Sequence, residues 1–357
     1  MSMRNKILSM DLLNIPMQFL KSRSVRRRQL EPCLGFTLIE LLVVIVVLGI
    51  LLSLLLPAFN SIREGARQSV CSNQLRQLGL GLQQYESRNG AFPAAATGAT
   101  SGEFKDEPRY NVLAYILPYL ELDYIADIFD MENDWNDKTN RKTELSAAEL
   151  EIFKQRMGFT SNNFSVTNDR IAGQDAFQFL CSSAPVRDTD VSQGTRTYMY
   201  PHAATDYCSA YAIDDDLYSR YTNTHGYEGP EAAFEKGGLQ LNKRLRTSAF
   251  KDGLGNTFML FESAGKPYRY VDGEPYGNAY DNFTQWSNWK ASMKLNPGIQ
   301  SQTFNRDKLI NHTNIGEVYS FHPDGAMILY GDGACLLYTS DAADEGLGVD
   351  LGGRRII

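Results

Sequence analysis

The sequence has few of the residues that usually build metal and catalytic centres. Its 357 residues include five cysteines and four histidines, His202, His225, His312 and His322. No two of these histidines share a metal-ligand spacing and cysteines are not nearby, so the pattern does not predict a metal site. Positive charge is not in surplus either, because the net charge is −7, and this speaks against nucleic-acid binding.

Long apolar runs are also scarce, and the one exception extends from Gly35 to Phe59. A helix rises about 1.5 Å per residue, so a helix over this run would cross a hydrocarbon core of roughly 30 Å. Positive residues precede the run, namely Lys21, Arg23, Arg26, Arg27 and Arg28. Because such flanks stay in the cytoplasm, we expect a single-pass inner-membrane protein with a cytoplasmic N-terminus and an exported C-terminal domain.

Glu40 is the only charged residue inside the apolar run. A lone carboxylate at mid-bilayer costs about 2.5 to 3.5 kcal/mol, so we expect Glu40 to find a partner. The six residues from Gly35 to Glu40, GFTLIE, resemble the cleavage and methylation site of type IV prepilins and type II secretion pseudopilins. The hexad speaks against the alternative interpretation, a plain signal anchor.

This resemblance implies a processing step and an assembly contact. The prepilin peptidase/N-methyltransferase would cut between Gly35 and Phe36 and methylate the new Phe36 amine. Glu40 would then pair with the terminal amine of a neighbouring subunit. Residues 1–35 would be a basic leader, which contains four methionines that could start translation: Met1, Met3, Met10 and Met17. A start at Met17 would give a leader of conventional length.

The apolar pattern continues beyond the membrane segment at three- and four-residue spacings. The stripe consists of Phe59, Ile62, Ala66, Cys71, Leu75, Leu78, Leu82 and Tyr85. The spacing predicts one spine helix, about 80 Å long, with a transmembrane half over residues 36–58 and an amphipathic half over residues 59–90. Pro57 is expected to kink it. Pilin spines resemble this arrangement, which implies packing against other pilin-like subunits.

A second resemblance covers the chain from Gly35 to Gly333. Its positions near the spine helix are Arg67, Cys71, Ser72, Asn73, Gln74, Leu75, Gly79, Leu80, Tyr85, Gly90, Phe92 and Pro93. Later positions are Leu117 to Glu121, Phe179 to Ser182, Asp252, Gly253, Asn256, Glu262, and the H-x9-DG motif of His322, Asp332 and Gly333. Together they resemble a large bacterial prepilin-like family with a domain of unknown function. The chain departs from that pattern at Ser183-Ala184 and around residues 130 to 170.

Residues 91–334 are expected to form an exported α+β domain, in which a mostly antiparallel sheet packs against the spine helix in a pilin-like arrangement. The predicted strands are Phe177 to Cys181, Thr197 to Tyr200, Thr257 to Phe261, Val318 to Phe321 and Ala326 to Tyr330. Residues 322–325 are predicted to close a hairpin, and residues 91–108 to form a surface loop.

Two helical regions are predicted ahead of the strands. Asn111 to Phe129 is apolar at helical spacing and broken at Pro118, whereas Ser146 and Glu149 form a capping box before a helix of about three turns. A candidate calcium loop lies between them, with the oxygen ligands Asp130, Glu132, Asp134 and Asn136. An EF-hand requires glycine in place of Trp135 and glutamate in place of Arg141, so a solvated acidic loop is favoured and no cofactor is predicted.

No catalytic site is predicted, and we interpret the chain as a non-enzyme. Ser320, His322 and Asp332 could supply the three groups of a hydrolase triad, but no nucleophile-elbow sequence is present. The acidic run 214–216 is typical of a solvated face. The aromatic residues, Trp286 among them, could form a carbohydrate-binding surface, although core or rim positions are commoner.

Three cysteines are expected in the native exported domain, namely Cys71, Cys181 and Cys208. Cys33 would leave with the leader, and Cys335 lies in the C-terminal tail. An exported domain can hold one disulfide and a spare thiol. The sequence leaves open which two residues pair, and we favour a bond involving Cys181.

The C-terminal tail has an unusual sequence. Cys335 to Glu345, CLLYTSDAADE, and Val349 to Ile357, VDLGGRRII, look like translations of the two constant parts of a transposase-based sequencing adapter. We therefore interpret residues 335–357 as not native. The alternative is a genuine strand, Cys335 to Tyr338, followed by a polar tail.

Two functions fit these predictions. The first is a pseudopilin-like structural subunit of a pilus-like filament or secretion apparatus. The alternative is an exported binding module that uses the membrane segment only as an anchor and holds a glycan or another extracellular ligand. Crosslinking along the spine helix distinguishes them, because a filament subunit packs against copies of itself.

Overall fold

The computed structural model describes residues 37–98, 104, 106–156, 164–173, 176–185, 187, 204–213, 237–280, 285–295 and 310–338. Gly35, Phe36, the predicted strand at 197–200 and the acidic run at 214–216 lie outside these ranges. The chain divides after Pro57 into two compact units, each described by itself.

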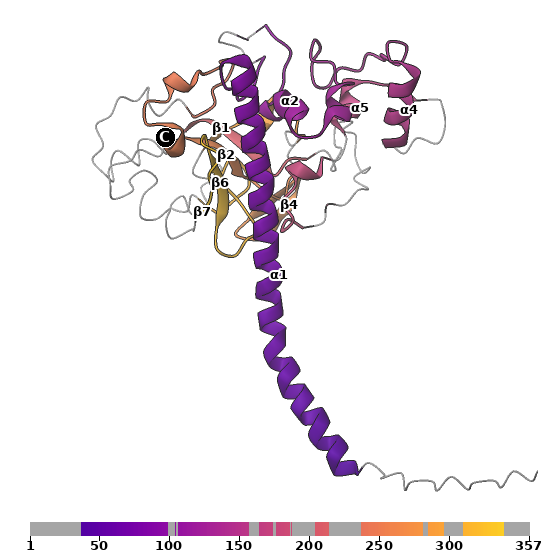
Figure 1. The fold of residues 1–357 in the computed structure, drawn as a ribbon, viewed down its shortest axis with the longest axis vertical. Coiled ribbons are helices and arrows are strands. Elements are labelled where there is room, and N and C mark those ends of the chain that lie inside the picture. The colour runs from indigo at the N-terminus through magenta and orange to yellow at the C-terminus, as the bar shows by residue number, and fades with distance from the viewer. Residues whose placement is uncertain are drawn as a thin grey trace, which may run out of the picture. The chain divides into compact units, whose positions relative to one another are not determined.

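Helix α1 extends over Leu38–Asn89 and confirms the predicted spine helix (Figure 1). It begins with a capping box, because the Thr37 N–H donates to Glu40 Oε2 at 2.8 Å and the Glu40 N–H donates to Thr37 Oγ1 at 3.3 Å. It ends before Gly90, which has a φ of +73° that suits a helix-terminating glycine.

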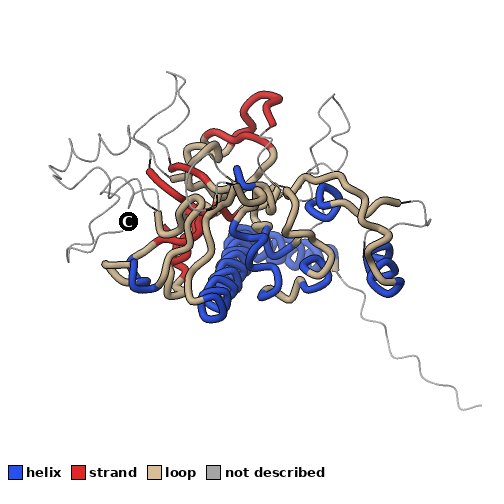
Figure 2. The backbone as a smooth tube through the Cα atoms, turned by 90° about the horizontal axis from the view of Figure 1, so that it is seen from above, coloured by secondary structure: helices blue, strands red, loops and turns tan. Residues whose placement is uncertain are grey.

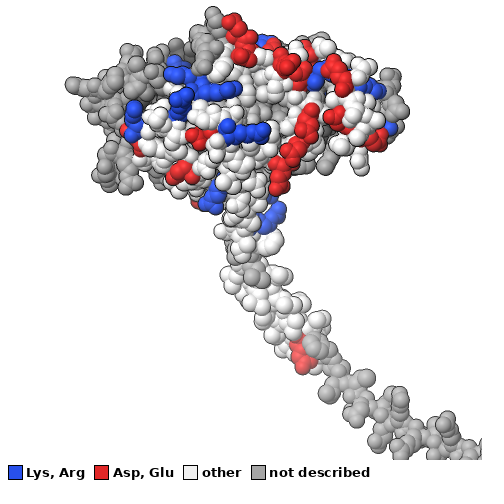
Figure 3. Space-filling view, turned by 45° about the horizontal axis from the view of Figure 1, so that its top comes forward, with Lys and Arg blue, Asp and Glu red and all other residues white. Residues whose placement is uncertain are grey.

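In the first unit, the described residues 37–57 belong almost entirely to α1. The apolar side chains from Leu38 to Leu54 are exposed, and the helix is long and apolar enough to cross a membrane. This stretch carries no Lys or Arg (Figure 3). The kink predicted at Pro57 concerns the junction of the two units and stays a prediction.

In the second unit, α1 packs one face against the rest of the domain. The buried positions of the predicted stripe are Cys71, Leu75, Leu78, Leu82 and Tyr85, whereas Phe59, Ile62 and Ala66 are exposed. The stripe is therefore a core face only from Cys71 onward.

The core of this unit is a five-stranded sheet beside α1 (Figure 2). Its strands are β1 Tyr207–Ile213, β2 Phe258–Glu262, β5 Met293–Leu295, β6 Ala326–Tyr330 and β7 Cys335–Tyr338, in the order β5-β1-β2-β6-β7. The β1–β5 pairing is parallel and the other three pairings are antiparallel. Strands β3 Tyr268–Val271 and β4 Glu274–Tyr280 form a separate hairpin. The α+β, mostly antiparallel, pilin-like prediction is confirmed.

Side chains alternate along each strand, so successive residues point to opposite faces of the sheet. Both faces are buried. Leu260 on β2 and Leu329 on β6 join the cluster that contains the buried face of α1. The next residue of β2, Phe261, joins a second cluster with Ile328 of β6 and Cys208 of β1 on the opposite face. The sheet therefore separates Cys208 from the α1 side.

Short helices cover the remaining part of the α1 side. They are α2 Val112–Ile116, α3 Asp123–Ala126, α4 Ala147–Arg156 and α5 Asn168–Ala172, with 3-10 turns at Leu117–Tyr119, Phe177–Phe179, Thr247–Ala249, Leu254–Asn256 and Trp289–Ala291. The break predicted at Pro118 falls in the first of these turns. The predicted capping box is present at the start of α4, where the Ser146 N–H donates to Glu149 Oε2 at 2.7 Å.

Four local predictions are wrong. Phe177–Phe179 forms a 3-10 turn instead of a strand. Residues 318–321 do not pair with β6. Instead, Val318 makes an isolated parallel bridge to Ile310, and Tyr319 makes one to Ser263. Residues 322–325 therefore do not close a hairpin. The segment from Ala91 to Thr97 is buried rather than at the surface, because its backbone bonds to the segment around Leu245 and its alanines pack in the core.

The predicted acidic loop is held by arginines. Asp134 pairs with Arg109, and Asp130 lies 3.4 Å from Arg141, the residue at the position where an EF-hand has glutamate. Burial would raise the pKa of both carboxyls, but hydrogen bonds outweigh it and lower both pKa values. Asp134 accepts these bonds from Arg109, and Asp130 accepts them from Asn133 and the Glu132 N–H, helped by the charge of Arg141. The loop is thus a paired, partly buried element, and calcium binding stays untested.

Strand β7 has the bounds of the strand in the alternative interpretation of the C-terminal tail. Its residues Cys335–Tyr338 pair antiparallel with β6. The interpretation of residues 335–357 as not native stays a prediction.

Candidate functional site

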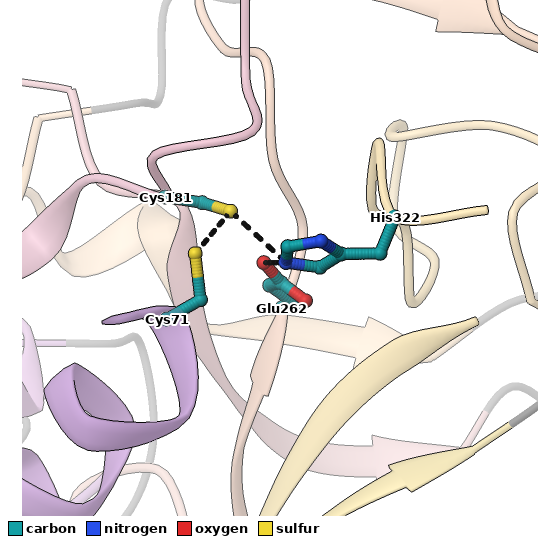
Figure 4. Close-up of side chains that lie close together, drawn as sticks. All are labelled: Cys71, Cys181, Glu262 and His322. Carbon is teal, nitrogen blue, oxygen red and sulfur yellow. Dashed lines mark hydrogen bonds and ion pairs between the residues drawn. The ribbon is translucent and has the colours of Figure 1, made fainter. Parts of the chain in front are cut away.

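Four buried side chains from four separate segments converge between α1 and the sheet (Figure 4). Cys71 comes from α1, Cys181 from the loop after Phe179, Glu262 from the end of β2 and His322 from the loop before β6. One ligand atom from each residue lies within 4.8 Å of those of the other three. The group therefore combines two thiols, a carboxyl and an imidazole at a spacing that could hold a metal ion.

The backbone around Cys181 is fixed by a buried carboxylate. Asp206 Oδ2 accepts the Cys181 N–H at 2.8 Å, and Oδ1 accepts the Gly265 N–H at 3.0 Å. Asp206 also forms an ion pair with Arg187, which compensates its charge inside the protein. These contacts hold the cysteine loop against the end of β2.

Glu262 is fully buried at the last position of β2. Its Oε2 accepts the Met327 N–H at 3.0 Å, while Oε1 accepts no hydrogen bond from the described residues and lies 3.5 Å from His322 Nε2. Burial disfavours the charged carboxylate and raises the pKa of Glu262 despite this contact with His322.

His322 lies between two carboxylates. Its Nδ1 is 2.6 Å from Glu64 Oε1 and 3.1 Å from Ser183 Oγ, and its Nε2 faces Glu262 and, at 3.5 Å, Cys181 Sγ. Burial alone would lower the pKa of His322, but its hydrogen bonds to Cys71, Glu262 and Glu64 and the charge of Glu262 raise this pKa to about 10. With Cys71 reduced, the ring is therefore an imidazolium at neutral pH.

The two sulfur atoms of the cluster are in close contact. Cys71 Sγ lies 2.7 Å from Cys181 Sγ, and the Ser182 N–H donates to Cys71 Sγ at 3.2 Å. If both side chains are thiols, the hydrogen bond from Cys181, helped by His322 and Ser182, lowers the pKa of Cys71 to about 4. The same contact raises the pKa of Cys181, so Cys71 would carry the thiolate.

The three residues considered for a hydrolase triad, Ser320, His322 and Asp332, do not assemble into one. Ser320 Oγ accepts the backbone N–H of His322 at 2.9 Å, and the ring of His322 turns toward the two glutamates instead. Asp332 Oδ1 accepts the Ala334 N–H at 2.9 Å in the turn between β6 and β7. In the described geometry, these three residues therefore do not form the hydrogen-bonded chain of nucleophile, base and carboxylate that a triad requires.

The predicted family-motif residues separate into two groups. Glu262 and His322 meet in the cluster. Asp252, Gly253 and Asn256 form the turn before β2, where the Asn256 side chain donates to the Asp252 carbonyl at 2.8 Å. Gly253 and Gly333 have φ angles of +82° and +88°, which explains glycine at both turns.

Sequence reasoning missed the meeting of His322 with two cysteines. Cys181 is 110 residues from Cys71 and 141 residues from His322, so no ligand spacing could reveal the cluster. The signal available was indirect: all four residues lie in separate patches of the same family resemblance.

Comparison with known protein families matches residues 60–345 to the family described as "Protein of unknown function (DUF1559)". The chain belongs to the DUF1559 family. Residues 32–56 match the prokaryotic N-terminal methylation motif. The four clustered residues all lie within the DUF1559 match, whereas Glu40 lies within the methylation motif.

This DUF1559 protein is also similar to two curated type II secretion system proteins. It is 36% identical over 74 residues to type II secretion system core protein G of Pseudomonas aeruginosa. The aligned residues make up 21% of this chain and 50% of that protein. The corresponding protein of Pectobacterium carotovorum is 34% identical over 87 residues, covering 23% of this chain and 56% of that protein. The chain thus spans about half the length of the curated relatives it matches. No solved structure matches.

Proposed function

We propose that this DUF1559 protein is a pseudopilin-like structural subunit that is processed by a prepilin peptidase and assembled through α1. The observation that carries the proposal is the methylation motif at residues 32–56, which runs directly into a helix able to span a membrane. Similarity to core protein G of two type II secretion systems supports the same function.

The cleavage site proposed is the bond between Gly35 and Phe36. The α1 capping box starts at Thr37, so the helix begins immediately after the residue that would become the mature N-terminus. Both Thr37 donors bond to Glu40 Oε2, at 2.8 and 2.7 Å. A carboxylate has two oxygens, so Glu40 can keep this cap and still pair with the amine of a neighbouring subunit.

The proposed location follows from the membrane segment and its flank. The basic residues before Gly35 would remain in the cytoplasm, the apolar half of α1 would span the inner membrane, and the sheet domain would be exported. In this position α1 supplies both the anchor and the surface that neighbouring subunits contact.

The mature N-terminus tests the processing step. We would purify the full chain from membranes that contain a prepilin peptidase and determine its N-terminus by mass spectrometry. The expected terminus is N-methylated Phe36, and Gly35→Ala should leave the leader attached. Gly49→Ala is a matched control in the same apolar run, because the position of its Cβ has no neighbour within 4 Å, and it should be cleaved normally. An uncleaved leader on the unsubstituted chain would contradict the proposal.

A further inference from the structure

The sulfur atoms of Cys71 and Cys181 are closer than two sulfur atoms in van der Waals contact. They lie 2.7 Å apart, whereas even carbon atoms, which are smaller than sulfur, prefer about 3.5 to 4.0 Å. A disulfide brings two sulfurs to about 2.05 Å. We propose that Cys71 and Cys181 form a disulfide that fastens the spine helix α1 to the loop following Phe179.

The neighbouring cysteine Cys208 is not a competing partner. It lies in the apolar cluster on the opposite face of the sheet, with Phe261 and Ile328. Its Sγ is 3.4 Å from the Nζ of the buried Lys266. The alternation of side chains along β1 therefore resolves the pairing that the sequence left open.

A metal ion bound by the four clustered residues is the competing explanation, and the geometry disfavours it. Two thiolates on one tetrahedral zinc, each about 2.3 Å from the metal, lie about 3.8 Å apart, so the two sulfurs would have to separate by about 1 Å. His322 would also need a free lone pair on Nε2. Its place between Glu64 and Glu262 instead favours an imidazolium, whose two N–H groups both donate.

The charges of the cluster also fit a disulfide better. A disulfide carries no charge, which leaves the His322 imidazolium between the carboxylates of Glu64 and Glu262. With Glu64 included, the disulfide cluster carries one net negative charge, whereas a zinc ion with two thiolates, Glu262 and a neutral His322 would leave two. Because buried uncompensated charge is costly, this difference favours the disulfide.

Formation of the bond requires an oxidant. The proposed exported location supplies one class of oxidant, the exported thiol–disulfide oxidoreductases. The Cys71 thiolate attacks the disulfide of an exported thiol–disulfide oxidoreductase, forming a mixed disulfide and releasing that protein's first thiolate. The Cys181 thiolate then attacks the Cys71 sulfur and releases the second. The oxidoreductase gains two electrons and, after protonation, is a dithiol; the two cysteine thiols have lost two protons and two electrons.

Peptide mapping of the full chain tests the proposal. The chain would be purified from the membranes of a host with an oxidising exported compartment, alkylated with N-ethylmaleimide while denaturing, and digested with trypsin without reduction. Cleavage after Arg67 and Arg76 gives QSVCSNQLR, and cleavage after Arg170 and Arg187 gives IAGQDAFQFLCSSAPVR. Cys208 lies in a third tryptic peptide, which follows Arg196. The expected product is the first two peptides joined, two hydrogens lighter than their sum.

Each other result overturns the proposal. N-ethylmaleimide on both Cys71 and Cys181 would show free thiols, and elemental analysis of the same sample for zinc would then identify a metal site. A link from either residue to the peptide of Cys208 or Cys335 would show a different pairing. As a second measurement, Cys71→Ala and Cys181→Ala should each lower the unfolding temperature by on the order of 10 °C, and the double variant by no more than either one. Cys208→Ala is the matched control and should keep the joined peptides.

Discussion

At the scale of single residues, His322 determines the charge state of the cluster. It contacts Glu64 and Glu262 through different ring nitrogens, and Glu64 also lies 3.5 Å from Arg67. Removing one partner of a buried ion pair costs about 3 to 5 kcal/mol, because the remaining charge stays buried without compensation. His322 is therefore expected to stabilise the exported domain.

The first residue-scale prediction concerns pH. Burial would lower the pKa of His322, but contacts with Cys71, Glu262 and Glu64 raise it above its usual value of 6.5. The proposed disulfide removes the contribution of Cys71, while the two glutamates still raise the pKa. A raised pKa means that the contribution is fully present below pH 6.5 and is lost as the pH rises through the folded-state pKa. The unfolding temperature of the detergent-solubilised chain should therefore fall between pH 7 and pH 10, and His322→Gln should be less stable and lose most of this slope.

A second buried histidine provides the control for that prediction. His312 lies outside the cluster, and its Nδ1 is 3.2 Å from the carboxyl group of Asp272. Like His322, it is therefore a buried histidine beside a carboxyl group. His312→Gln is the matched substitution of a buried histidine outside the cluster, and comparing the two variants isolates the contribution of the cluster. If His322→Gln and the unsubstituted chain lost stability equally between pH 7 and pH 10, the assignment of an imidazolium would be wrong.

Residue chemistry could be predicted from the sequence only where it is local. The predicted Ser146 and Glu149 cap depends on neighbours three residues apart. The Thr37 and Glu40 cap is just as local but was not predicted, because Glu40 was interpreted as an assembly residue. Glu262 and His322 were identified as motif positions, but not as partners of Cys71 and Cys181. Their meeting depends on how four distant segments pack, and no spacing in the sequence encodes that.

At the scale of elements, the contact between α1 and the sheet depends on small residues. A Cβ added at Gly79 would lie 2.9 Å from Leu329 Cδ1 of β6, so this glycine lets the helix approach the sheet closely. Nearby, the Gln83 side chain donates to the Gly331 carbonyl at 3.2 Å. The helix and β6 are thus joined by both packing and hydrogen bonding.

Matched substitutions of two α1 glycines test this packing. Gly79→Leu should destabilise the domain by about 1 to 3 kcal/mol, because it overfills the interface with Leu329. Gly65→Leu, where a Cβ has no neighbour within 4 Å, should stabilise the helix by about 0.5 to 0.8 kcal/mol through helix propensity alone. Thermal unfolding of both full-length variants measures the difference; equal unfolding temperatures would contradict the described interface.

The elements predicted correctly were those with strong periodicity or capping. Helix α1, the capped α4 and the apolar strands β2 and β6 follow from the sequence. Strand β1 was missed because its sequence, YCSAYAI, is rich in small residues and buried on both faces, which removes the alternating pattern. Phe177 to Cys181 was misread because an apolar run alone does not distinguish a strand from a 3-10 turn.

At the scale of the whole molecule, the exposed apolar side chains of α1 need a partner. Phe59 and Ile62 are 58% and 69% exposed within the second unit, and Val70 and Leu80 are exposed as well. None of them is part of the core cluster that buries Cys71 and Leu75. Large apolar side chains on one helix are costly to leave in water and are typical of a surface that another chain covers.

The proposed assembly predicts that this surface contacts other copies of the chain. Single cysteines placed at Phe59, Ile62, Val70 or Leu80 should form crosslinked ladders in membranes that contain the assembly machinery, because spine helices pack against each other there. Glu151→Cys on α4 is the matched control, exposed but away from α1, and should remain monomeric. If the four α1 variants also stayed monomeric under the same oxidant, the structural-subunit proposal would fail, and the anchored binding module would become the better explanation.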